Sequence, residues 1–449
     1  MLGPLETIAG DVIRLAREAG ASGAECSISQ GEEFDAQVRK SEVETVKESG
    51  SRGVGVSVLF GRNTGSSYTS DMSPEGLRAM VSQAVDLAKI TTEDPFAGLP
   101  DPAELGKLST DLGLYSPETA TFEAARKVEL ARAAEQAALS YDARITNSEG
   151  ASFHSTMSRH AFANSLGFIG SYETTSCSLS VVPVAQNGER MERDYWYSVA
   201  RGAGQLEAPD YIGRKAAERV IRRLGSRKIP TQKAPVIFEP RVARSLLGHI
   251  FEAINGDSIY RRASFLLDRL GEKVAADHIT VVDDATIPGL FGSSPYDDEG
   301  VPSRRTVVIE NGVLRNYLLN SYTARKLGLK TTGNASRGIT GNASIGHGNL
   351  YLEKGALTVE QLFKQAGSGL YVTELMGFGV NAVTGDYSRG ASGLWIENGE
   401  LAYPVSEVTI AGNLKDMLLN IEGVADDLEF RGSVASPTLL VGGMTISGT

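Results

Sequence analysis

The spacing of apolar residues changes along the chain and predicts helices and strands in alternation. Near the N-terminus apolar residues recur at helical spacing and are followed by Gly20, which predicts an amphipathic helix: Leu5, Ile8, Val12, Leu15, Ala16 and Ala19. From Ala24 to about Tyr68 short apolar runs broken by glycine predict strands. Ser73-Pro74-Glu75 then begins a second helix that runs to about Lys89. Residues 1–105 are therefore expected to form an N-terminal α+β domain.

Two proline-containing stretches separate the rest of the chain into parts. Residues 91–117 hold four prolines and little periodicity, which is typical of a linker. An alanine-rich helix to about Ser140 and a helix over Tyr211 to Leu224 are expected to enclose strand-like segments at 152–163, 172–184 and 191–200. Residues 226–235 form the second stretch. The pattern predicts a central α+β domain over residues 106–228.

Asn-Gly pairs mark expected hairpins, because both residues accept the positive φ that a type I′ turn demands. One pair, Asn187-Gly188, falls between strand-like segments of the central part. Asn311-Gly312 and Asn398-Gly399 each lie between strand-like runs of the last part. Residues 229–449 should therefore form a C-terminal domain dominated by antiparallel β-sheet. The fold class expected overall is α+β, with N-terminal helix and sheet domains followed by this β-rich domain.

Composition and charge exclude some classes of partner. The 449 residues are 41% hydrophobic, and no apolar run approaches the roughly 18 residues of a membrane span. The N-terminal residues do not read as a signal peptide, so a cytoplasmic location without membrane attachment is expected. Net charge is −11, and a broad positive face for nucleic acid is missing. The one dense basic cluster, Arg219 to Lys228, lies at an expected helix end and is interpreted as a solvated helix terminus.

Several motifs occur along the second half of the chain in a fixed order. They are VIFEPRVARSLLGHIFEAINGDS (236–258), SSPYDDEGVPSRRT (293–306), GVLRNYLLNSYTARKLGLKTTGNASR (312–337) and the glycine-serine loop, Asn-Gly hairpin and TIAGNLKDM run of 384–417. In these motifs the chain resembles the TldD/PmbA family, in its PmbA (TldE) branch. Several motifs in one order are far more specific than any single short pattern.

The resemblance implies a function that depends on a second protein. In that family two related subunits form a cytoplasmic zinc metalloprotease that degrades largely unfolded peptides, and one subunit carries the metal on a His-Glu-x-x-x-His helix. This chain lacks that motif. It is therefore expected to be a non-catalytic subunit without a cofactor of its own. Its expected partner is a metal-bearing TldD-like subunit that holds the zinc, and its expected substrates are unfolded peptides.

The helix expected after Pro240 stands where the catalytic branch carries its metal. Only His249 and Glu252 remain there as remnants, and they supply two ligands at most, short of the three protein ligands that a catalytic zinc usually has. The family's further cysteine ligand is also missing, since no cysteine follows Cys177. No catalytic residue and no metal ligand are therefore assigned. A core face is expected from Leu246, Leu247, Ile250 and Ile254.

A glycine-rich loop is the expected substrate contact. Glycines let a backbone approach closely, and an extended peptide could add to the sheet through main-chain hydrogen bonds. The residues assigned to substrate binding are Gly377, Phe378, Gly379, Gly385 and Asp386.

Two other functions stay open from the sequence. The first is a homodimer that binds peptides without cleaving them. The second is a hydrolase with an unrecognised site, for which the carboxylate cluster Asp297, Asp298 and Glu299 could bind a hard cation or act as acid and base. The cluster lacks the spacing of a calcium loop, and an acidic turn is the favoured interpretation. The sequence does not distinguish a homodimer of the isolated chain from a heterodimer.

Overall fold

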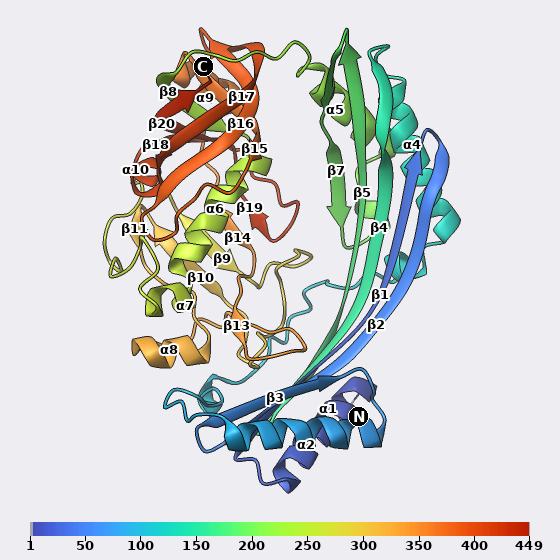
Figure 1. Cartoon of the computed structure of the whole chain (residues 1–449), viewed down its shortest axis with the longest axis vertical. Coiled ribbons are helices and arrows are strands. Elements are labelled where there is room, and N and C mark those ends of the chain that lie inside the picture. The colour runs from blue at the N-terminus through green and yellow to red at the C-terminus, as the bar shows by residue number, and fades with distance from the viewer. Residues whose placement is uncertain (1–2, 449) are drawn as a thin grey trace.

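The first half of the chain is built around one long antiparallel sheet. The computed structural model describes residues 3–448 (Figure 1). Seven strands pair in the order β3-β2-β1-β4-β5-β6, with β7 also on β5. These strands are β1 (Gly23–Arg39), β2 (Glu42–Phe60), β3 (Asn63–Thr69), β4 (Ile145–Asn164), β5 (Ile169–Asn187), β6 (Arg190–Arg193) and β7 (Trp196–Ala200). The accompanying helices are α1 (Pro4–Glu18), α2 (Pro74–Ile90), α3 (Pro117–Thr121), α4 (Ala124–Leu139) and α5 (Pro209–Ile221), with short 3-10 turns at Pro102–Glu104 and Ala203–Gln205.

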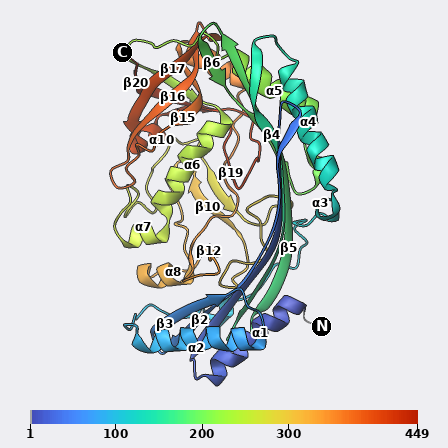
Figure 2. The ribbon, with the colours of Figure 1, turned by 45° about the vertical axis from the view of Figure 1, so that its right-hand side comes forward.

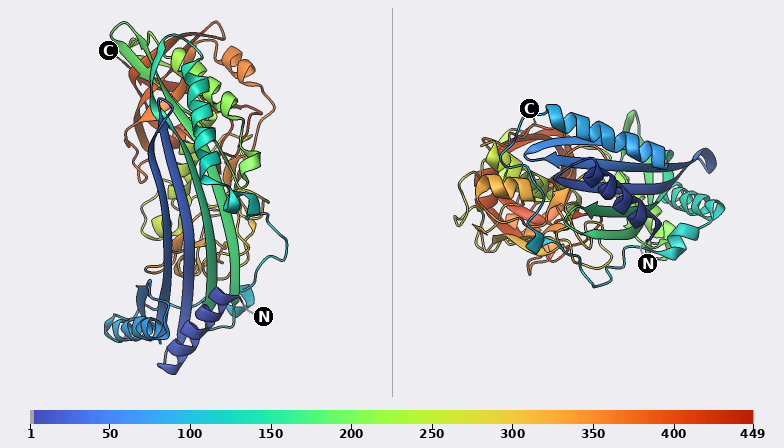
Figure 3. Two further views of the ribbon diagram at one scale, coloured as in Figure 1. Left: turned by 90° about the vertical axis from the view of Figure 1, so that its right-hand side faces the viewer. Right: turned by 90° about the horizontal axis from the view of Figure 1, so that it is seen from below.

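The helices cover one face of this sheet at its two ends. Alternate residues of β1 point to that face, because successive side chains of a strand point to opposite sides. Ala24, Cys26 and Ile28 pack under α1 and α2, whereas Phe34 and Val38 pack under α4 and α5. Figure 3 shows the long strands running from the blue helices at one end to the teal helices at the other.

Strands from both sides of the 91–117 stretch pair with each other. β1 pairs with β4 from Glu25↔Asn164 to Val38↔Ala151. The alanine-rich helix expected to run unbroken to Ser140 is two helices, α3 and α4. Phe122 and Glu123 interrupt it with extended backbone, at φ −69°, ψ 119° and φ −63°, ψ 138°. The hairpin at 187–188 joins β5 to β6, and its turn is centred one residue later than expected, since Asn187 pairs with Arg190.

The C-terminal domain contains two larger sheets. A six-stranded sheet has the order β17-β16-β15-β8-β20-β18, and a five-stranded one the order β11-β10-β9-β14-β19. Their strands are β8 (Gln232–Phe238), β9 (Val281–Asp284), β10 (Arg305–Glu310), β11 (Val313–Leu314), β14 (Leu350–Leu352), β15 (Gly369–Met376), β16 (Asp386–Glu397), β17 (Glu400–Asn413), β18 (Ile421–Val424), β19 (Val434–Ala435) and β20 (Leu439–Ser447). The short pair β12 (Ala335–Ser336) and β13 (Ser344–Ile345) stands apart. Helices are α6 (Pro240–Ile254), α7 (Gly256–Tyr260), α8 (Ser321–Leu327), α9 (Val359–Ala366) and α10 (Leu414–Leu419).

Most strand pairs of this domain are antiparallel, as expected. The exceptions are β15 with β8 and β14 with β19, which run parallel. Both Asn-Gly hairpins are confirmed, with positive φ at both turn residues: 48° and 80° at Asn311-Gly312, and 54° and 77° at Asn398-Gly399. The α+β class with a C-terminal domain dominated by antiparallel sheet is therefore confirmed. Within residues 3–448 no helix is both long and apolar enough to cross a membrane.

The C-terminal domain lies against the face of the long sheet that the helices leave free (Figure 2). The two parts approach closely at Gly55 of β2, where a Cβ atom would lie 1.9 Å from the carbonyl oxygen of Ile339. Only glycine fits there. Arg201, after β7, donates hydrogen bonds to the carbonyls of Gly289 and Leu290. The two halves of the chain therefore touch through backbone packing and through arginine side chains.

Candidate functional site

Helix α6 carries the remnants of the metal motif on its polar side. Pro240 occupies the first helical turn, where its missing N–H costs nothing. The core face is confirmed: Leu246, Leu247, Ile250 and Ile254 are at most 4% exposed. His249 and Glu252 point away from this face, with 4.0 Å between His249 Nδ1 and Glu252 Oε2.

His249 and Glu252 do not make a zinc site. Within residues 3–448 no three His, Cys, Asp or Glu side chains gather so that they could hold a metal ion. Glu252 is 63% exposed, whereas His249 is 19% exposed and its Nε2 atom is buried without a hydrogen-bond partner. Burial lowers the pKa of His249; Glu252 opposes this shift, and the charge of Arg389 adds to it. The donors present therefore do not fit a catalytic zinc.

The cluster at residues 297–299 is an acidic turn, in which Asp297 and Glu299 are buried and Asp298 is partly buried. Asp297 Oδ1 accepts backbone N–H groups of Glu299 and Val301 at 3.0 and 2.9 Å, and its Oδ2 accepts that of Ala335 at 3.0 Å. Burial, followed by the charge of Glu299, raises the pKa of Asp297 to about 8.

The neighbours of Asp297 bond to other segments. Asp298 accepts the N–H of Arg337 at 2.7 Å, and Glu299 that of Ser321 at 2.9 Å. The three carboxylates thus hold separate backbone segments together.

Both cysteines, Cys26 of β1 and Cys177 of β5, lie in the long sheet with buried thiols. Burial raises the pKa of Cys26 and of Cys177. A raised pKa keeps the thiol protonated, and the thiolate is the reactive form.

The glycine-rich loop lies between β15 and β16. Phe378 is 98% exposed at its tip. Gly377 and Gly385 have φ of 75° and 86°, a region that L side chains rarely adopt. A Cβ atom on Gly379 would lie 2.1 Å from the carbonyl oxygen of Ser388, so this glycine packs against its own chain. Asp386 accepts hydrogen bonds from Thr384 and Asn413, which lower its pKa.

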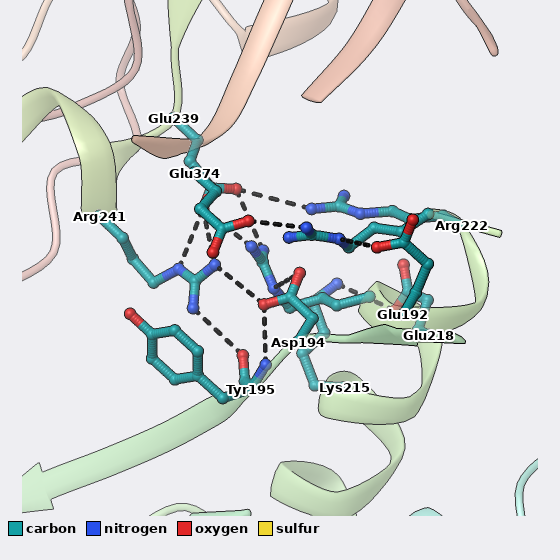
Figure 4. A network of polar contacts seen from close by, with 11 residues as sticks. Glu192, Asp194, Tyr195, Lys215, Glu218, Arg222, Glu239, Arg241 and Glu374 are labelled. Carbon is teal, nitrogen blue, oxygen red and sulfur yellow. Dashed lines mark hydrogen bonds and ion pairs between the residues drawn. The ribbon is translucent and has the colours of Figure 1, made fainter. Parts of the chain in front are cut away.

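A network of arginines and carboxylates, which the sequence patterns did not predict, joins the central segment to the C-terminal domain. Arg219 of α5 pairs with Glu239 at 2.9 Å and with Asp194 at 3.3 Å. Arg241 of α6 pairs with the same two carboxylates at 2.9 and 3.6 Å. Figure 4 shows Asp194, Glu239 and Arg241 facing one another across the junction. Burial raises the pKa of Glu239, and Arg219 and Arg222 oppose that rise.

The interpretation of residues 219–228 as a solvated helix terminus is wrong for its first arginines. The Arg219 side chain is 4% exposed, and that of Arg223 is 16% exposed. Arg223 pairs with Glu374 of β15 at 2.7 Å. Their acidic partners come from distant parts of the chain, so no local spacing could have revealed the network. The density of arginine at a helix end was the only signal.

Known protein families and individual relatives match the chain over most of its length. Three family models match in order: PmbA/TldA metallopeptidase domain 1 at residues 24–88, the central domain at 117–224 and the C-terminal domain at 231–448. Metalloprotease PmbA of Escherichia coli O157:H7 is 43% identical over 95% of this chain and 93% of its own length. The PmbA homolog of Haemophilus influenzae is 40% identical over 97% and 94%.

A crystal structure shows the same fold. A Bacteroides thetaiotaomicron protein named for modulation of DNA gyrase superposes with a TM-score of 0.92 at 28% identity, over the full length of both chains.

Proposed function

The chain belongs to the PmbA/TldD family of metallopeptidases, on its PmbA (TldE) side, and from this membership we propose that it is the non-catalytic subunit of a two-subunit zinc metalloprotease. Its partner is a related, metal-bearing TldD-like subunit. Together they degrade unfolded peptides, and this chain supplies part of the wall that encloses them. The zinc belongs to the partner.

The proposal rests on the side chains of helix α6 that could act as metal ligands. A catalytic zinc takes three protein ligands and leaves one position for water. This helix offers His249 and Glu252, 4.0 Å apart, with no third donor gathered beside them in the described part of the chain. A family member built in this way contributes to proteolysis by positioning peptide or partner.

Two exposed features support a paired subunit. Residues 42–52 of β2 pair only with β1 and are exposed on both faces, so a row of backbone donors and acceptors is left open. Natural proteins cover or pair such edges. Phe378 is the second feature, because its almost fully exposed apolar side chain is available to a partner or a peptide.

A peptidase assay with metal analysis tests the proposal. The chain alone should hold far less than one zinc after dialysis and should not cleave an unfolded peptide; cleavage should need the TldD-like partner. His249→Ala should leave the activity of the pair intact. Near one zinc per chain that is lost in His249→Ala, or cleavage by the chain alone, would contradict the proposal.

Light scattering tests the pairing separately. At low micromolar concentration the chain should not run as a 47.7 kDa monomer. A stable homodimer that binds peptides, but gains no cleavage with the partner, would favour the peptide-binding module instead.

A further inference from the structure

A cavity of about 480 Å³ lies between the N-terminal half of α6, the strands β15 and β16, and the end of the long sheet. Its charged lining consists of five arginines and three carboxylates: Arg193, Arg223, Arg241, Arg244, Arg389, Glu149, Asp194 and Glu374. Val182, Val242 and Leu375 add apolar surface. The cavity is separate from the acidic turn and from the glycine-rich loop.

Three of the five arginines are neutralised by carboxylates of the protein. Arg193 pairs with Glu149 at 2.9 Å. Arg223 pairs with Glu374 at 2.7 Å, and Arg241 with Glu239 and Asp194. Every carboxylate that lines the cavity is therefore already engaged.

Arg244 and Arg389 have no carboxylate partner within residues 3–448. The Nη1 atom of Arg244 donates to the hydroxyl of Tyr197 at 3.3 Å, a neutral partner. The Nε atom of Arg389 is buried and has no hydrogen-bond partner. An ion pair between either guanidinium and a described carboxylate is missing, so two positive charges face the cavity without compensation.

Unpartnered polar atoms gather behind Arg389. The hydroxyl of Tyr387, two residues earlier on β16, is buried without a hydrogen-bond partner, and so is Nε2 of His249. The rings of Tyr387 and His249 are 6.1 Å apart. Buried polar groups in native proteins are satisfied by protein, water or ligand. Tyr387 and His249 lie outside the lining, so the buried Nε of Arg389 is the unpartnered atom that a ligand in the cavity could satisfy.

We propose that this cavity binds a peptide carboxylate through Arg244 and Arg389. The identity of the ligand as a peptide rests on the proposed function. A guanidinium presents a planar fork of donors that matches a carboxylate. The cavity lining also holds three carboxylates, which disfavour a doubly charged phosphate more than a singly charged carboxylate. The carboxylate comes from the C-terminus of a peptide or from an acidic side chain.

Calorimetric titration of the full chain tests the site without zinc or cleavage. The probes are N-acetyl-tetraalanine with a free C-terminus, its C-terminal amide, and N-acetyl-Ala-Glu-Ala-Ala amide. At least one acidic probe should bind ten times or more tighter than the neutral amide. A preference for the first acidic probe identifies the C-terminus, and one for the second identifies a side chain.

Variants test whether Arg244 and Arg389 cause the preference for the acidic probe. Arg244→Gln with Arg389→Gln should abolish the preference for the acidic probe. Arg389→Lys should retain part of it, because the charge remains. Arg214→Gln, at an exposed arginine of α5 paired with Asp210, should retain all of it. Melting of each variant confirms folding.

Equal or undetectable binding of acidic and neutral probes would overturn the inference. So would an unchanged preference in the double variant, or tighter binding of inorganic phosphate. None of these results bears on where the zinc resides, so the proposed function can fail or stand independently.

Discussion

Arg219 and Glu239 form a two-pronged ion pair that fastens helix α5 to the start of helix α6. Nη2 lies 2.9 Å from Oε1 and Nη1 lies 3.1 Å from Oε2. Both side chains are 4% exposed, so water does not screen the pair. The central segment and the C-terminal domain are thereby joined by a buried ion pair that takes one residue from each.

Glu239→Gln should destabilise the chain by roughly 3 kcal/mol, because removal of one partner leaves a buried guanidinium under-compensated. Asp194 remains as its second partner. Urea unfolding measures the loss. Glu173→Gln removes a carboxylate from an ion pair in which the side chains of Arg159 and Glu173 are 46% and 44% exposed, and should cost less than about 1 kcal/mol. Equal losses in the two variants would show that the buried pair contributes no more than a surface one.

Asp283→Asn should change how stability depends on pH. Burial raises the pKa of this carboxyl to about 6, and the hydrogen bond from Asn334 opposes the rise. Between about pH 4 and pH 6 the folded state keeps a proton that the unfolded state has lost, so stability falls as pH rises. The fall attributable to Asp283 is up to roughly 3 kcal/mol.

Unfolding of the wild type and the variant, compared from pH 4 to pH 7, isolates this term. The variant should lose the corresponding slope, whereas Asp277→Asn, at an 82% exposed side chain, should keep the wild-type profile. Parallel curves for wild type and Asp283→Asn would contradict the assignment.

Gly379→Ala should destabilise the protein by roughly 1 to 3 kcal/mol, because the new Cβ lies 2.1 Å from a backbone oxygen that cannot move freely. Gly248→Ala is the matched control in α6. A Cβ there meets nothing within 4 Å, and the helix should gain about 0.5 to 1 kcal/mol. Thermal melting of both variants measures the difference. If Gly379→Ala melted at the wild-type temperature, the loop would be able to shift and make room for the new Cβ, and the prediction would be wrong.

Phe378→Ala should leave the free energy of unfolding within about 0.5 kcal/mol, because the side chain is 98% exposed. If Phe378 contacts peptide or partner, cleavage by the assembled pair should fall severalfold. Cleavage and light scattering of the variant with the TldD-like partner separate the two contacts. Full cleavage with normal assembly would remove Phe378 from the proposed substrate path.

The sequence predicted what short-range patterns encode. Leu246 and Ile250 lie on the buried face of α6, and the Asn311-Gly312 turn closes its hairpin, because helical periodicity and turn chemistry are local. The network around Arg219 and the unpaired Arg389 could not be predicted, since their surroundings combine residues far apart in the chain. The substrate assignments at Gly377, Phe378, Gly379, Gly385 and Asp386 stay predictions.

The pairing of β1 with β4 determines how the long sheet unfolds. Residues 25–38 and 151–164 share one continuous ladder of backbone hydrogen bonds. If the fragments on either side of residue 105 were separated, each would have an open strand edge, which invites aggregation. The halves of this sheet should therefore denature together, in one transition. A protease that nicks the loop around residue 105 should leave two pieces that stay associated until the whole sheet melts.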